Sequence, residues 1–308
     1  MIAEVLLVLA GHSSSLFPSD HTVHPAFTPL LHPGESRLDT IVFSRYLCFP
    51  GEQQCLEALG QIACRYRRVK LSCSTLSRSS SRYICALCAA LNKVLKDEYE
   101  TLVVATEAKV LQRDPDYVAS RSFVPLSSIR ATFAEWDAPL AVLDSLMDQL
   151  EAQDHWPPGP LIDMLLARAH TGVRRIADIL SRLSVAVQRV WKTQLAAFII
   201  HGTLSSVDPL ASGKYALLEG SIPSCVSSQS RDSIGYVGRA IATVKAAKWR
   251  TQLPRDLVLD HTTALETVLP EDQHQFDKVI LMIRTNVSEW LWLNVLTRKD
   301  VEDAVDSL

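Results

Sequence analysis

Apolar residues recur every three or four positions between residues 174 and 201, and no other feature constrains the fold as strongly. The pattern holds for about six turns of a helix, and the charged residues of this segment mostly occupy the other face. An apolar stripe with this period is the face that an amphipathic α-helix packs against a protein core. The stripe consists of Ile176, Ile179, Leu180, Leu183, Val187, Val190, Trp191 and Phe198.

The same period predicts helices elsewhere in the chain. One runs over residues 83–112 and turns Leu102, among others, toward the core. Another runs over residues 126–150 and is expected to be interrupted at Pro139, because proline removes a helical hydrogen bond. Residues 36–70 are expected to hold two helices separated by Pro50-Gly51.

Three further helices complete the prediction. One follows the proline-rich break at residues 156–160, one begins near Arg231, and one covers residues 276–291. No stretch longer than four residues alternates strictly enough to be a β-strand. We therefore predict an all-α fold of stacked helical bundles, with roughly eight to ten helices.

Four segments lack a helical pattern. Residues 11–34 contain four prolines and are expected to form a loop. Residues 72–82 are rich in serine and predict a flexible surface loop, and residues 203–230 predict an irregular loop. The link between Pro254 and Pro270 is poorly patterned.

The composition excludes several classes of protein. Of the 308 residues, 47% are hydrophobic and 21% are charged, so disorder over the whole chain is not expected. The net charge of −3 provides no general attraction to nucleic acid or acidic membranes. The apolar run Val5–Ala10 is short, follows Glu4 and has no basic residue before it, which favours a short buried helix over a signal peptide. We expect neither nucleic acid nor a membrane as a partner.

The chain has seven cysteines, an odd number, and they lack the dense disulfide framework of a small secreted domain. Reduced thiols are therefore the favoured interpretation. Cys85 and Cys88 form a C-x-x-C pair, but they lie within a predicted amphipathic helix and lack a second pair for zinc. Core packing is the favoured interpretation. A metal site at His21, His24 and His32 lacks a Cys or carboxylate ligand at useful spacing.

The densest charge in the chain is basic and lies between residues 65 and 82. A solvated loop is the simpler interpretation. The alternative is an electrostatic contact that phosphorylation of Ser77 or of residues 79–81 would tune. The cluster comprises Arg65, Arg67, Arg68, Lys70, Arg78 and Arg82.

No arrangement of residues indicates catalysis. Ser212-Gly-Lys214 resembles the end of a phosphate-binding loop, but the first glycine and the final Ser or Thr are missing. We therefore predict a protein that is not an enzyme and binds no cofactor or metal. Two alternatives stay open: an unrelated helical adaptor or tether, and a thiol- or metal-dependent enzyme that uses the Cys- and His-rich first third.

Several segments, in order along the chain, resemble the γ-tubulin complex component family, and most of all its short fourth component. The segment around His201-Gly202 is similar to the family pattern Y-K-Q-L-x-x-W-x-x-H-G-x-L, although Phe198 stands where the family favours Trp. The matching segments are Met1–Gly11, Leu31–Glu35, Tyr83–Leu95 with Tyr99, Gln188–Leu204, Ser221–Ser224, Ile234–Gly238 and Ser288–Trp292.

The resemblance implies that residues 1–308 are the N-terminal, lateral-assembly domain of such a component. In this family that domain contacts neighbouring components, and a second helical domain, which would lie beyond Leu308, binds γ-tubulin. A fragment, a truncated gene model and a genuine short form all fit this interpretation. The implied role is structural, in complexes that nucleate microtubules at centrosomes or spindle pole bodies in the cytoplasm. The expected partners are other components, and γ-tubulin through the complex.

The first helix supplies candidate residues for the lateral contact. Val5, Leu6 and Leu9 lie in the apolar opening segment, where an exposed stripe would pair with the next subunit. The alternative places these three side chains in the buried core of the chain itself.

Overall fold

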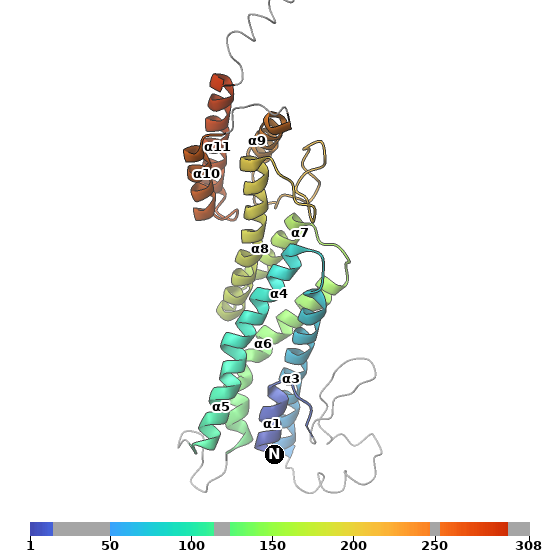
Figure 1. Ribbon diagram of the computed structural model, residues 1–308. Coiled ribbons are helices and arrows are strands. Elements are labelled where there is room, and N and C mark those ends of the chain that lie inside the picture. The colour runs from blue at the N-terminus through green and yellow to red at the C-terminus, as the bar shows by residue number, and fades with distance from the viewer. Residues whose placement is uncertain (15–49, 114–123, 247–252, 295–308) are drawn as a thin grey trace, which may run out of the picture. The chain divides into compact units, whose positions relative to one another are not determined.

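The computed structural model describes residues 1–14, 50–113, 124–246 and 253–294. Every regular element in these ranges is a helix, apart from an isolated β-bridge between Ala211 and Leu217, which confirms the all-α prediction. None of the described helices is long and apolar enough to cross a membrane. The described residues form two compact units (Figure 1).

The first unit comprises residues 1–78, 88–154 and 173–179. Its long helices α3 and α6 pack along each other, and α1 contacts both α3 and α5 (Figure 1). Helix α4 continues through a π-helical turn at Leu95–Glu100 into α5, without a break. The bounds are α1 Ile2–Leu9, α3 Pro50–Leu76, α4 Arg82–Val94, α5 Thr101–Leu111 and α6 Leu126–Glu151.

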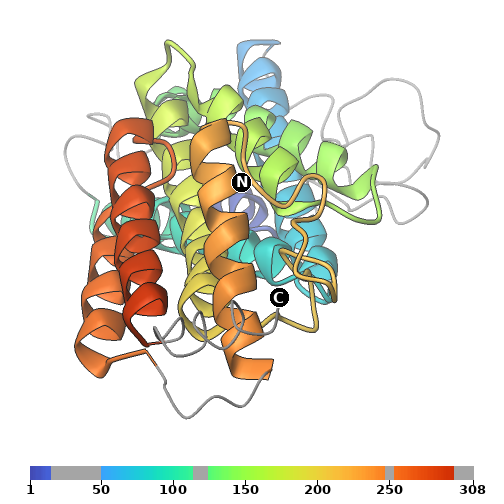
Figure 2. The same cartoon turned by 90° about the horizontal axis from the view of Figure 1, so that it is seen from above.

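The second unit comprises residues 79–87, 155–172 and 180–308. Helix α11 packs against both α9 and α10, and the three run side by side in Figure 2. The indole of Trp191 donates a hydrogen bond of 2.8 Å to the Ser221 carbonyl and faces the Phe276 ring. The bounds are α7 Pro158–Ala169, α8 Arg174–His201, α9 Ser228–Ala246, α10 Arg255–Thr267 and α11 Gln273–Asn294.

Helix α8 follows its predicted stripe, and a glycine follows its last residue. Gly202 has a φ of +56°, the left-handed conformation that glycine adopts without steric cost. The Thr203 amide donates to the Ala197 carbonyl at 3.0 Å and the Gly202 amide to the Phe198 carbonyl at 3.1 Å. The bond from Gly202 to the carbonyl four residues earlier is that of the αL C-cap motif.

Two predicted breaks are wrong because buried side chains continue on both sides of them. Helix α6 passes through Pro139, since Trp136, Leu140 and Leu143 form one buried stripe that packs toward α3. This packing offsets the roughly 3 kcal/mol that an internal proline costs. Helix α3 extends to Leu76, so only the segment after it remains of the loop predicted at residues 72–82.

Pro50 and Gly51 also differ from the prediction, because they open α3 instead of separating two helices. Proline favours the first turn of a helix, where its missing N–H has no partner to lose. The predicted helix before Pro50, the prolines of the 11–34 segment and the three histidines of the proposed metal site lie outside the described residues. Helix α9 begins at Ser228, so residues 203–227 form the irregular connection.

The link between Pro254 and Pro270 contains a helix that the sequence pattern missed. Only His261 and Leu265 of α10 are fully buried, which leaves little apolar periodicity to detect. The Lys192 ammonium group of α8 donates to the carbonyls of Leu265, Glu266 and Val268 at 3.1, 3.0 and 2.6 Å. Lys192 thereby caps the end of α10, where the last carbonyls lack helical partners.

Helices α8 and α9 meet at a glycine. A Cβ atom at Gly238 would lie 2.1 Å from the Phe198 ring, so only glycine permits this approach. Phe198 and Gly238 belong to two separate segments of the family resemblance, and the structure brings them together. Both segments therefore shape the core of the second unit.

We expect Gly238→Ala to lower the free energy of unfolding by about 1–3 kcal/mol, because overpacking exceeds the roughly 1 kcal/mol that alanine gains over glycine in a helix. Urea unfolding followed by circular dichroism measures the change. Gly172→Ala is the control, since a Cβ there meets nothing within 4 Å. An unchanged or more stable Gly238→Ala variant would contradict the packing argument.

Candidate interaction site around the first helix

The first helix is held in place by its own apolar side chains. Val5, Leu6 and Leu9, the candidates for a lateral contact, are 1%, 6% and 0% exposed within the first unit. The structure thus places them where the alternative interpretation expects them, in the core. A direct role for them in subunit contact stays a prediction. In this conformation the three side chains hold α1 in place and thereby position its exposed side chains.

The end of α1 is anchored by a buried tyrosine. Tyr99 donates a hydrogen bond of 3.0 Å to the Leu9 carbonyl, one of the last carbonyls of the helix. These carbonyls have no partner within their own helix, so the phenol satisfies a group that would otherwise be buried alone. Gly11 follows with a φ of +91°, and a Cβ there would lie 3.1 Å from the Tyr66 ring.

Tyr99 lies within a cluster of aromatic rings. Its ring stacks on Tyr66 with a centroid distance of 4.4 Å and meets Phe133 and Trp136 edge-on at 6.0 and 5.3 Å. Burial raises the pKa of the Tyr99 phenol well above its ordinary value. The hydroxyl therefore keeps its proton and remains a donor.

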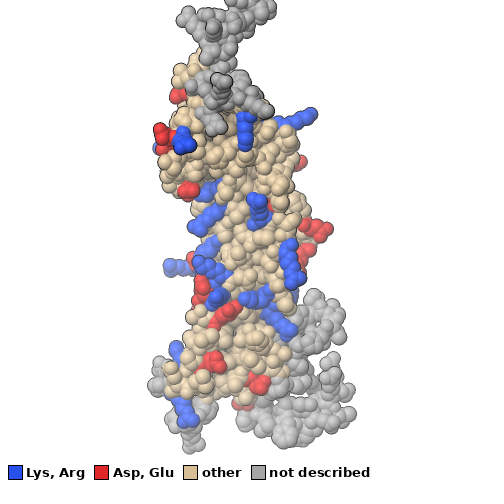
Figure 3. Space-filling model, viewed as in Figure 1, with Lys and Arg blue, Asp and Glu red and all other residues tan. Residues whose placement is uncertain are grey.

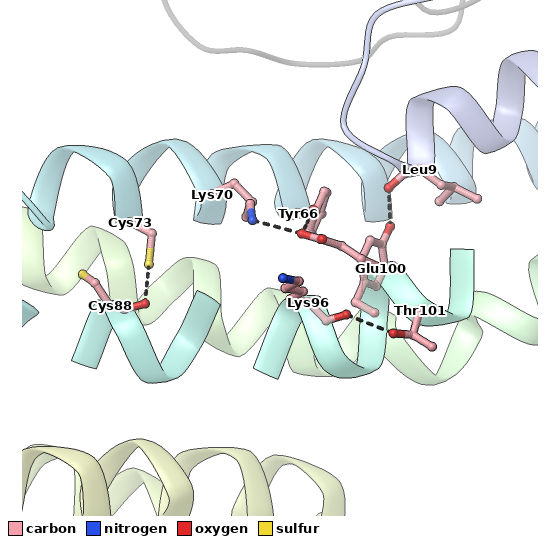
Figure 4. Close-up of polar contacts among 9 residues, drawn as sticks. Leu9, Tyr66, Lys70, Cys73, Cys88, Lys96, Glu100 and Thr101 are labelled. Carbon is pink, nitrogen blue, oxygen red and sulfur yellow. Dashed lines mark hydrogen bonds and ion pairs between the residues drawn. The ribbon is translucent and has the colours of Figure 1, made fainter. Parts of the chain in front are cut away.

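A charged group extends the network toward α3. The Tyr66 hydroxyl and the Lys70 ammonium group donate to the same Glu100 carboxylate oxygen, at 2.7 and 3.0 Å (Figure 4). Burial opposes ionisation of Glu100, but these two donors outweigh it and lower the pKa of its carboxyl. We call Leu9, Tyr66, Lys70, Tyr99 and Glu100 the α1 docking site.

The π-helical turn at Leu95–Glu100 determines which residues reach this site. It adds one residue to the helix, so Tyr99 and Val103 are buried and Leu102 is only half-buried. The predicted inward position of Leu102 is therefore wrong. The Thr101 hydroxyl donates to the Lys96 carbonyl at 3.1 Å across this turn. π-Helical turns occur frequently at functional sites.

The basic cluster lies mostly on α3, where acidic residues of α6 face it. Arg65 pairs with Asp137, and Arg68 pairs with Asp144 and Asp148 at 3.1 and 2.9 Å. The solvated-loop interpretation is wrong for these residues, because their helix continues through them. Burial raises the pKa of the Asp144 carboxyl although Arg68 opposes this. Basic and acidic side chains are both present on the face shown in Figure 3.

Arg175, in the first turn of α8, belongs to the same unit. Its guanidinium lies over the Trp136 ring at 4.4 Å and pairs with Glu135 at 2.6 Å. A stacked and paired guanidinium fixes the position of an aromatic ring more firmly than either contact alone. The first turn of α8 is thereby attached to the aromatic cluster that holds Tyr99.

The α1 docking site consists of hydrogen bonds from two tyrosines and one ion pair, and it holds α1 in position. Among the described residues, no group of three or more His, Cys, Asp or Glu is placed to hold a metal ion. Sequence reasoning identified Tyr99 through the family pattern and Lys70 through the basic cluster, but it missed Tyr66 and Glu100. The shift of the buried stripe after Leu95 is the signal that could have located the turn.

Comparison with known proteins identifies the family. The sequence profile described as Gamma tubulin complex component N-terminal matches residues 2–299, and the chain therefore belongs to this family. The chain is also similar to the Gamma-tubulin complex component gfh1 of Schizosaccharomyces pombe, with 24% identity over 208 residues. That match covers 65% of this chain and 33% of gfh1, so the chain spans about a third of the relative.

Tyr99→Phe removes the hydroxyl and keeps the ring, leaving the Leu9 carbonyl without its donor. We expect the free energy of unfolding to fall by about 1–2 kcal/mol and the α1 amides to exchange hydrogen faster. Hydrogen exchange with mass spectrometry of the N-terminal peptide measures this. Tyr236→Phe, which removes an exposed hydroxyl, is the control. Unchanged exchange in α1 would show that the hydrogen bond does not hold the helix.

The Glu100 carboxyl predicts a dependence of stability on pH. Because its pKa is lowered in the folded chain, it stabilises the fold above its unfolded pKa of about 4.3. This contribution is lost as the pH falls through the lower, folded value. We expect Glu100→Gln to lose less stability than the wild type between about pH 5 and pH 3.

Urea unfolding at a series of pH values measures this difference between the two proteins. Glu107→Gln is the control, because Glu107 is an exposed residue of α5. If Glu100→Gln and the wild type lose stability in parallel on acidification, the ion pair does not contribute as described.

Proposed function

We propose that the chain is a structural subunit of a γ-tubulin complex, which templates microtubule nucleation through lateral contacts between neighbouring components. The observation that carries this proposal is the family match over residues 2–299, nearly the whole chain. The similarity to a fission yeast protein named as a γ-tubulin complex component supports it. In this proposal the partners are other components, and γ-tubulin is reached through the complex.

The proposal places the chain at microtubule-organising centres in the cytoplasm and gives it no catalytic role. Its ionisable groups around α1 support a structural role, because Lys70 and Glu100 are engaged with each other and with Tyr66. The correspondence to the short fourth component is part of the same proposal. It rests on the segments of resemblance that begin with Met1–Gly11.

Lateral contact requires exposed side chains, and α5 offers them beside the docked α1. Val104 and Leu111 are 64% and 75% exposed, and they lie seven residues apart on one face of the helix. Leu7 of α1, which contacts α5, is 42% exposed. We define Val104, Ala108 and Leu111 as the α5 face and assign it to the contact with a neighbouring component.

Affinity purification of the tagged chain from its own cells, with mass spectrometry of the recovered proteins, tests the proposal. We expect other γ-tubulin complex components and γ-tubulin to be recovered with the wild type. The double variant Val104→Asp, Leu111→Asp should lower their recovery about tenfold, which corresponds to roughly 1.4 kcal/mol of binding free energy.

Leu259→Asp is the matched control, since Leu259 is 66% exposed and lies on α10 of the other unit. Its recovery should equal that of the wild type. Equal recovery with the α5 variant would reject the assigned face. Recovery of an unrelated set of proteins by the wild type would reject the subunit role and favour a helical adaptor or tether.

A further inference from the structure

Two cysteines lie close together where α3 and α4 form a helical hairpin. Cys73 lies in the last turns of α3 and Cys88 lies in α4, and both side chains are fully buried in the first unit. The Cys73 sulfur lies 3.7 Å from the carbonyl oxygen of Cys88 (Figure 4). The Cys73 thiol thus lies against the backbone of Cys88 on the next helix of the chain.

The two thiols also influence each other's ionisation. Their mutual hydrogen bond lowers the pKa of Cys73, and the nearby Lys70 charge adds to this against the effect of burial. The same hydrogen bond and burial raise the pKa of Cys88. The thiolate is the form of cysteine that reacts with oxidants, and the lowered pKa favours this form at Cys73.

Two of the other four described cysteines have different surroundings. Cys85 donates to the Ser79 carbonyl at 3.4 Å, and Cys55 lies 4.0 Å from an Arg130 nitrogen. Both side chains are partly exposed. Exposure alone would therefore direct oxidation to these sites, whereas proximity directs it to Cys73 and Cys88.

We propose that Cys73 and Cys88 are an oxidation site at which hydrogen peroxide forms a disulfide that cross-links α3 to α4. The Cys73 thiolate attacks one peroxide oxygen, the O–O bond breaks, and hydroxide leaves to give a sulfenic acid. The Cys88 sulfur then attacks the Cys73 sulfur, and the sulfenic oxygen leaves as water with the Cys88 proton. Two thiols and one peroxide thus yield one disulfide and two molecules of water.

The position of the pair explains how a buried site can react. Cys73 lies close to the end of α3, where helices fray, and the residues that follow α3 include exposed serines. Hydrogen peroxide is small enough to enter during such opening. The sulfurs must then approach to about 2.0 Å, which requires the side chains to rotate about χ1. This inference is independent of the proposed function.

Peptide mapping of the purified chain tests the site. The protein is treated with hydrogen peroxide, remaining thiols are blocked, and trypsin is added without reductant. Cleavage after Lys70, Arg78, Arg82 and Lys93 releases Cys73 in the peptide Leu71–Arg78 and Cys88 in Tyr83–Lys93. We expect these two peptides to be joined, and fragmentation between Cys85 and Cys88 to place the bond on Cys88.

Two variants give an independent reading of the same bond. The linked peptides should persist in Cys85→Ala and be lost in Cys88→Ala, with circular dichroism confirming that both variants are helical. The oxidised wild type should also melt a few degrees higher than the reduced protein, and reductant should reverse the shift.

A bond placed on Cys85 by fragmentation would overturn the proposal. Peroxide treatment that oxidises Cys55 and leaves Cys73 and Cys88 as free thiols would overturn it as well. Because fragmentation is performed on the wild type, the test does not depend on the folding of any variant.

Discussion

The first unit depends on the contacts of the Tyr99 phenol, above all on its hydrogen bond to the end of α1. Its hydroxyl satisfies the end of α1, its ring packs on Tyr66 and Trp136, and burial keeps its proton in place. A buried hydroxyl without a partner would cost about 1–3 kcal/mol, so the position of α1 is coupled to that of the π-helical turn. The ion pair between Lys70 and Glu100 lies at the partly exposed edge of the α1 docking site.

Much of the fold follows from the period of apolar residues. The stripe of α8 was readable because local pattern and tertiary packing agree there. Pro139 and residues 72–76 were misread, since burial against other helices overrides a local signal. Helix α10 was missed because Lys192, more than 70 residues earlier in the chain, supplies contacts that no local pattern contains.

The candidate site was less predictable than the fold. The opening residues Val5, Leu6 and Leu9 were singled out for a contact between subunits, yet they are buried. A stripe of apolar residues specifies that a face is covered, but it does not specify what covers it. Tyr66 and Glu100 were invisible to periodicity, since their roles depend on hydrogen bonds between residues 34 positions apart.

The π-helical turn has a geometric consequence for α5. Each residue of a helix is rotated by about 100° from the previous one, so the additional residue at Leu95–Glu100 turns all of α5 by that angle about its axis. Without it, Val103 and not Val104 would take the outward direction. A single inserted residue therefore sets the direction, about the axis of α5, in which the exposed apolar side chains of this helix point.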